Sequence, residues 1–343
     1  MYELLQHLIN GLAAGTIYAL VALGYTMVYG VLKLINFAHG DVMMVGVYVG
    51  YAVAFLLGRD AASVAGALTV FTVAMLACAL IGFAVERFAY RPLREKPRLT
   101  ALITAIGISF ALSYGFQLDL SVTAFGREWT VLPGAASKRF PDIIKAQRWA
   151  SVGEPAPADP DHPEAGPGGV CLRFGEDEQA SGCDDVILWN WQVIGFGIAL
   201  ALMVALQVLV YRTRFGKAMR AVSYDHRVAA LLGVPVDRVI ALTFMLGSAL
   251  AACAGILFAL KDKTIQPLMG LYVGLKAFIA AVIGGIGNLP GAVVGALLLG
   301  LCEEFIVGYT SSSWRDAVAF GFLIVVLLVR PEGLFGRAQA EKV

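Results

Sequence analysis

The chain has 343 residues, of which 59% are apolar and only 15% are charged, with a formal net charge of +1. Soluble domains carry roughly 25% charged residues, so this composition excludes an ordinary soluble protein. The apolar residues come in blocks of about 20, which is the length that a helix needs to cross the ~30 Å hydrocarbon core of a membrane. The sequence therefore predicts an all-α polytopic membrane protein.

The predicted spans follow one another along the whole chain. The first block has neither a basic flank nor a convincing small-residue cleavage site, so we do not expect a removable signal peptide. Two of the later pieces are short and flank a glycine-rich break at 284–291; if one of them is re-entrant, the number of spans is eight, and otherwise it is nine. The predicted spans are 4–30, 41–57, 61–85, 100–118, 188–210, 239–260, 271–283, 292–306 and 317–329.

Orientation follows from the lysines and arginines of the short loops. They gather on one side, chiefly in 87–98, in 211–238 and in the C-terminal tail. The positive-inside rule assigns that side to the cytoplasm, which leaves the N-terminus outside and the C-terminus cytoplasmic. The expected regions are N-terminal membrane helices in 1–118, a periplasmic insertion in 119–187, C-terminal membrane helices in 188–330 with a cytoplasmic loop at 211–238, and a tail in 331–343.

The insertion is rich in proline and acidic residues and shows little helical periodicity. Cys171 and Cys183 lie there, whereas the other three cysteines are in apolar spans. In an oxidising compartment these two could close a small loop, so we predict a disulfide, with two free thiols as the alternative. The insertion is interpreted either as a partly disordered solvent-exposed cap or as a docking surface for an extracytoplasmic partner.

The loop at 211–238 begins with a basic run and continues as a short amphipathic segment. Val228, Leu231 and Leu232 fall on one side of a helix, and Gly233 and Pro235 end it. A helix of this kind between two spans fits a groove on a soluble partner. The alternative is a positive-inside loop with one interfacial turn of helix.

A second polar stretch joins the first two spans and contains Asn36, His39, Gly40 and Asp41. Polar groups at such a position usually face a cavity or the protein interior. Asn36 or Asp41 could cap the next helix, and a helix that begins within the membrane can present N–H groups to a substrate carboxylate. The alternative is a tight capped turn with a satisfied histidine.

The glycine-rich break at 284–291 loosely echoes this stretch, since 291–295 resembles 40–46 in its small and branched residues. Paired interrupted helices of this kind suggest an internal repeat. The chain has no phosphate loop with Lys-Ser/Thr, no CxxC or HExxH metal site and no GxSxG elbow, so we predict no catalytic residue and no metal ligand.

Five ordered segments of the chain carry a resemblance to a known family: 24–46, 216–244, 249–255, 284–292 and 330–336. Together they resemble LivH-type permeases of the high-affinity branched-chain amino acid ABC transporters. The similarity covers the membrane portion from end to end, and it departs at the insertion near 130–185, which is longer than expected for that family.

The resemblance implies a permease subunit of an ATP-driven importer of leucine, isoleucine and valine in the bacterial inner membrane, and not an enzyme. It implies a second, LivM-like permease, two LivG/LivF-like ATPases that bind ATP and Mg, and a periplasmic amino-acid-binding protein. Membrane lipid is a further expected partner, and we expect no nucleic acid and no cofactor in this chain. The alternatives are a urea or short-chain amide permease and, in another class, an ATP-independent channel or secondary carrier.

Two sets of residues are predicted to act. A helix at about 220–232 should carry the coupling to the ATPases, and the polar stretches should form the pathway or its gate. The coupling residues are Arg220, Tyr224, Asp225, Arg227, Leu231 and Gly233, and the pathway residues are Asn36, Phe37, His39, Asp41 and Asn288.

Overall fold

The computed structural model describes residues 2–94, 96–124, 127–144, 148–153, 171–174 and 186–336. Among these, seven helices are long and apolar enough to cross a membrane, and two shorter apolar helices accompany them. The prediction of an all-α polytopic membrane protein is confirmed. The helices are α1 (Tyr2–Leu32), α2 (His39–Leu57), α3 (Val64–Ala84), α4 (Arg98–Gly115), α5 (Asn190–Arg212), α6 (Arg214–Tyr224), α7 (His226–Leu231), α8 (Val236–Asp262), α9 (Met269–Gly284), α10 (Leu289–Tyr309) and α11 (Arg315–Val329).

One of the two short pieces expected near the glycine-rich break is a full-length helix. α10 has 21 residues, enough to cross a membrane, whereas α9 has only 16. α10 begins earlier than predicted because Asn288 caps it and Pro290 occupies its first turn, where a missing N–H costs nothing. It also ends later than predicted, at Tyr309, and its two glutamates, Glu303 and Glu304, are buried inside the protein.

The helix α1 forms the centre of the bundle and packs against α8, α9 and α10. Its most apolar stretch is 94% buried, against 17% for α5 and 11% for the last span. Close packing depends on small residues, which let helix backbones approach in a membrane. A Cβ built on Gly15 would lie 2.8 Å from the Cα of Leu297 in α10.

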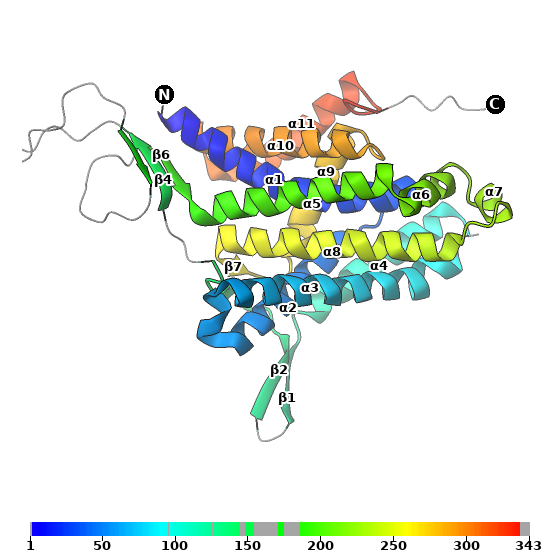
Figure 1. Ribbon diagram of the computed structural model, residues 1–343, viewed down its shortest axis with the longest axis horizontal. Helices are drawn as coiled ribbons and strands as arrows, with labels where there is room; N and C mark the ends of the chain where they lie inside the picture. Colours follow the sequence, from blue (N-terminus) through cyan, green and yellow to red (C-terminus); the bar gives the residue numbers. More distant parts are fainter. Residues whose placement is uncertain are drawn as a thin grey trace, which may run out of the picture.

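Figure 1 shows the bundle helices running in roughly the same direction across the view. The strands β4 (Arg148–Gly153) and β6 (Val186–Trp189) lie at one end of the bundle, and α6 and α7 lie at the opposite end. We call these the strand end and the corner end.

A break of the same kind precedes each of the helices α2 and α9. α1 is followed by Lys33 and α8 by Lys263, both with a positive φ, at 56° and 60°. After each break a turn of the same length leads into a helix whose second residue is glycine, Gly40 or Gly270. The counterpart of the turn between α1 and α2 is therefore the turn between α8 and α9, and not the segment 291–295 that its small residues had suggested.

The two matched helices cross at their first turns, where glycines allow the contact. A Cβ on Gly40 would overlap the carbonyl oxygen of Gly270 and would lie 2.8 Å from the Cα of Gly274. Such close approach of two helix starts requires residues without side chains.

Part of the insertion forms antiparallel strands. β1 (Asp119–Ala124) and β2 (Arg127–Pro133) form a hairpin, and β4 pairs with both β6 and β5 (Cys171–Phe174). β3 (Lys138–Arg139) pairs with β7 (Thr264–Ile265), in the turn between α8 and α9. Phe140 and Ile143, which follow β3, are each 1% exposed, so this segment is packed into the protein. Cys183 lies outside the described residues, and the disulfide with Cys171 stays a prediction.

Candidate functional site

The corner end is built by two short helices rather than the single helix expected at about 220–232. Thr213 caps α6 by accepting a hydrogen bond from the N–H of Gly216 at 3.1 Å. Asp225 has an extended backbone, and its Oδ1 accepts from the N–H groups of Arg227 at 2.8 Å and Val228 at 3.0 Å. The single-helix prediction is wrong because this aspartate ends α6 and caps α7. The same N–H groups of Val228 and Arg227 hold the pKa of Asp225 below its usual value.

The corner presents large apolar side chains to its surroundings. Tyr224 is 90% exposed, Leu231 is 87% exposed and Leu232 is 77% exposed. Gly233, with φ at 82°, allows the chain to turn directly after them. Several exposed apolar side chains at the tip of two short helices are typical of a docking surface for another protein.

Arg220 has a different position from the other predicted coupling residues. Its guanidinium donates to the carbonyl of Val210 in α5 and lies 5.7 Å from the centre of the Tyr211 ring. These contacts connect α6 to the end of α5 and hold the corner at a defined angle.

A cluster of ion pairs lies at the start of α8, which follows the corner in the chain. Asp237, in the first turn of α8, accepts from Arg91 and, at 2.6 Å, from Arg94. Arg94 also binds Glu86, which is buried. Tyr90, in the same segment as Glu86 and Arg91 (Val85–Leu93), donates to Asn36 Oδ1 at 3.1 Å. This segment thus contacts the start of α8 through Arg91 and the turn between α1 and α2 through Tyr90.

The four predicted pathway residues of that turn lie close together inside the bundle. The ring centroids of Phe37 and Phe278 are 5.9 Å apart, and those of His39 and Tyr25 are 4.7 Å apart. His39 and Asn36 are buried, and the Nε2 of His39 has no hydrogen-bond partner among the described residues. Asn36 does not cap α2, because its side chain is taken by Tyr90.

Asp41 is fully buried and faces α4. Its two carboxylate oxygens accept from the hydroxyls of Ser109 and Ser113, the latter at 2.5 Å. The serines stand one turn apart on one face of α4, so a single carboxylate receives both. The aspartate neither caps α2 nor is left without partners.

Asn288 lies apart from the other predicted pathway residues, at the far end of α9. Its side chain accepts from the N–H of Gly291 at 3.4 Å and donates to the carbonyl of Phe335 at 3.0 Å. The N–H of Leu334 in turn binds the carbonyl of Ile283 at 2.8 Å. In the structure this asparagine caps α10 and holds the segment 331–336 against the glycine-rich turn.

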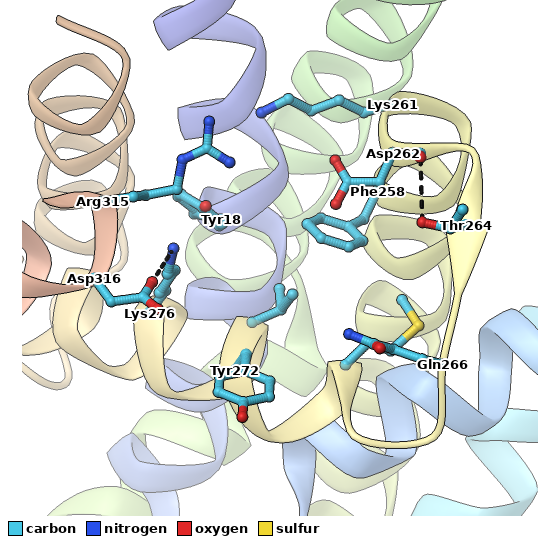
Figure 2. Close-up of a pocket in the computed structure, with 12 residues that line it drawn as sticks. Tyr18, Phe258, Lys261, Asp262, Thr264, Gln266, Tyr272, Lys276, Arg315 and Asp316 are labelled. Carbon is cyan, nitrogen blue, oxygen red and sulfur yellow. Dashed lines mark hydrogen bonds and ion pairs between the residues drawn. The ribbon is translucent and has the colours of Figure 1, made fainter. Parts of the chain in front are cut away.

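A charged cavity near the strand end was not anticipated from the sequence. It has a volume of about 270 Å³ and lies between α1, the turn from α8 to α9, and the start of α11 (Figure 2). Its lining residues are Tyr18, Phe258, Lys261, Asp262, Thr264, Gln266, Met269, Tyr272, Val273, Lys276, Arg315 and Asp316.

Most charges around this cavity are paired. Lys276 lies 2.9 Å from Asp316 and 3.2 Å from Glu303, and Lys261 lies 3.2 Å from Glu304. Tyr18 donates to Glu303 at 2.9 Å. The sequence did carry a signal, because a lysine and two glutamates inside predicted spans face the protein interior by the same rule that singled out Asn36 and Asp41.

The comparisons with known proteins give one consistent result. Residues 7–327 match the family model described as branched-chain amino acid transport system, permease component. The chain is 38% identical to the high-affinity branched-chain amino acid transport system permease protein BraD of Pseudomonas aeruginosa, with 100% of this chain and 99% of that protein aligned. It is also 38% identical to the corresponding LivH proteins of Escherichia coli and Salmonella typhimurium, over 99% of this chain and 97% of each of them.

Proposed function

Because the chain belongs to the family of permease components of branched-chain amino acid transport systems, we propose that it is the membrane-spanning permease of an ATP-driven importer of leucine, isoleucine and valine. It acts in the bacterial inner membrane, with the corner end in the cytoplasm and the strand end in the periplasm. The substrate and this orientation are parts of the proposal.

The exposed apolar corner is the observation that carries the ATP-driven part. Exposed apolar side chains such as Tyr224, Leu231 and Leu232 are expected where another protein binds, and a carrier that works alone has no such partner. Two ATPase subunits bind ATP and Mg and carry the hydrolysis, and each permease of a pair inserts its corner into a groove on one of them. This chain takes no part in the chemistry of ATP.

The contacts described above suggest how movement of the corner reaches the membrane. When the ATPases close, they displace α6 and α7, which are joined to α8 by a short turn. Asp237 transmits this displacement to Arg91 and Arg94, and Tyr90 transmits it to Asn36. Because α2 begins at His39, shortly after Asn36, a shift of Asn36 moves the crossing of α2 and α9. Helices that can pack in two discrete ways at this crossing would switch the pathway.

The other two partners belong to the remaining surfaces. A second, homologous permease pairs with this chain to complete the translocation pathway. A periplasmic amino-acid-binding protein delivers the substrate at the strand end, where the insertion supplies the docking surface. The segment after β3 supports this role, because its burial against the bundle connects the insertion to the turn between α8 and α9.

The test is uptake by proteoliposomes that contain the two permeases and the two ATPases, with ATP inside and the binding protein outside. Radiolabelled leucine and urea are supplied in parallel. The proposal predicts ATP-dependent uptake of leucine and none of urea. Uptake of urea alone would assign another substrate, and uptake of leucine in the absence of the ATPases would identify a carrier that works without ATP.

The hydrogen bond between Tyr90 and Asn36 has a separate test. Tyr90→Phe removes only the hydroxyl that binds Asn36, and we expect leucine uptake to fall severalfold while the affinity for the ATPases is unchanged. Equal uptake by the variant and the wild type would show that this hydrogen bond does not transmit the movement of the corner.

A further inference from the structure

The charged cavity holds two opposite charges that the protein itself does not pair well. No lysine or arginine nitrogen among the described residues lies within 4.0 Å of the Asp262 carboxylate. Arg315 has only a loose contact with Glu304 at 3.7 Å, and its Nε is buried without a hydrogen-bond partner in the part of the chain that the structure describes. Asp262 is exposed at the cavity and Arg315 is half-buried, so both charged groups are accessible to a ligand that supplies better partners.

Asp262 and Arg315 are placed to bind the two ends of one small molecule. Figure 2 shows them on opposite sides of the cavity, with their charged groups directed into it. An ammonium group against the carboxylate of Asp262 and a carboxylate against the guanidinium of Arg315 would form charge-assisted hydrogen bonds at both ends. An arginine is suited to this role because its planar guanidinium binds a carboxylate with two parallel bonds.

The balance of charge around the cavity favours a zwitterion over a simple ion. The three cationic side chains (Lys261, Lys276 and Arg315) stand against four carboxylates (Asp262, Glu303, Glu304 and Asp316). An anion would enter a region with a surplus of negative charge, and a cation would leave Arg315 with only its loose contact to Glu304. Only a molecule with both charges satisfies both groups.

Part of the remaining wall of the cavity is apolar, and the rest is formed by Tyr18, Thr264, Gln266 and Tyr272. Met269 and Val273 of α9 are 3% and 4% exposed, and Phe258 of α8 lies beside them. A few convergent polar groups with an apolar wall are typical of a site for a small molecule. At ~30 Å³ for each water, the cavity has room for roughly nine waters, or for an amino acid with a short aliphatic side chain.

We propose that this cavity is a binding site for the transported amino acid within a single permease, in which Asp262 holds the ammonium group, Arg315 holds the carboxylate, and α9 contacts the aliphatic side chain. The inference rests on the proposed function and adds a site to it. The cavity lies at the end where β3 pairs with β7, and Thr264 of β7 lines it. An amino acid released beside the insertion would therefore reach this site before it crosses the membrane.

The first experiment needs no variant. Binding of radiolabelled leucine to the full-length permease in nanodiscs is measured by equilibrium dialysis, and unlabelled competitors are added. Leucine should compete at least tenfold better than 4-methylpentanoate, which lacks the ammonium group, and than 3-methylbutylamine, which lacks the carboxylate. Equal competition by either analogue, or no binding of leucine, would overturn the proposal.

The second experiment uses charge-removing variants with matched controls. Asp262→Asn and Arg315→Gln should each weaken leucine binding at least tenfold, and Asp262→Asn should also abolish the preference for leucine over 4-methylpentanoate. The controls are Asp60→Asn and Arg59→Gln, which remove the same charges from an exposed turn after α2, outside the cavity. Size-exclusion profiles establish that each variant is folded.

The two proposals fail in different ways. If the complete transporter takes up leucine with ATP but the cavity variants bind leucine as the control variants do, the cavity site is wrong and the importer stands. If the transporter shows no ATP-dependent leucine uptake but the cavity binds leucine with the expected variant effects, the importer is wrong and the site stands.

Discussion

Substitution of Leu231 tests the corner as a docking surface. This side chain is 87% exposed in the permease alone, so nearly all of its apolar surface is still available for burial against a partner. Full burial of a leucine contributes about 1.5–3 kcal/mol. Leu231→Ser should therefore weaken binding of the ATPases by about ten- to one-hundred-fold, since ~1.4 kcal/mol corresponds to a factor of ten.

The assay is titration of the ATPase subunits onto the permease in nanodiscs, with the dissociation constant as the readout. Ala230→Ser is the matched control, because it changes an exposed residue of the same short helix that has little apolar surface. Neither variant should lower the melting temperature of the isolated permease. If Leu231→Ser and Ala230→Ser bind the ATPases with the same affinity, the corner is not the docking surface and the reasoning fails.

Three further predictions concern stability and local structure. Asp41→Ala leaves two serine hydroxyls of α4 without their acceptor and should lower the free energy of unfolding by about 1–3 kcal/mol; a melting temperature in detergent equal to that of the wild type would contradict this. Because the folded pKa of Asp225 lies below its ordinary value of 3.8, its cap stabilises α7 at higher pH and is lost as the pH falls below 3.8 through the folded pKa. Hydrogen exchange at the first amides of α7 should accelerate over that range in the wild type but not in Asp225→Asn, and identical profiles would argue against the cap. Gly40→Ala should destabilise the protein by about 1–3 kcal/mol because the new methyl group overlaps α9, whereas Gly30→Ala, which meets no atom within 4 Å, should change the thermal unfolding little; equal effects would show that the helix crossing tolerates a side chain.

The order and the approximate limits of the membrane helices could be predicted because lipid imposes a simple rule. A helix in a bilayer needs about 20 apolar residues, and the chain shows these blocks directly. The rule weakens for buried helices that carry charge. The apolar pattern of α9 and α10 does not show that Lys276, Glu303 and Glu304 are held by ion pairs with groups on other helices.

The candidate sites were predictable to different degrees. The corner could be located from its basic run and its apolar spacing, and the polar residues from Asp225 to Arg227 mark the start of α7. The coupling helix expected at about 220–232 runs through Asp225, however, and the pattern does not show that this residue also ends α6. Asn36, His39 and Asp41 were correctly expected to be buried polar residues, but the sequence did not say that Asp41 faces two serines of α4. The charged cavity joins groups from α1, α8, α9 and α11, and only tertiary structure brings them together.

The most direct test of the central claim is to measure uptake and ATP hydrolysis together in a transporter whose α7 has been replaced by a glycine–serine segment of equal length. The account predicts that ATP-dependent leucine uptake is lost, while the permease still folds and inserts into the membrane. Uptake at the wild-type rate after this replacement would contradict the account, because the transport of leucine would then not depend on the corner.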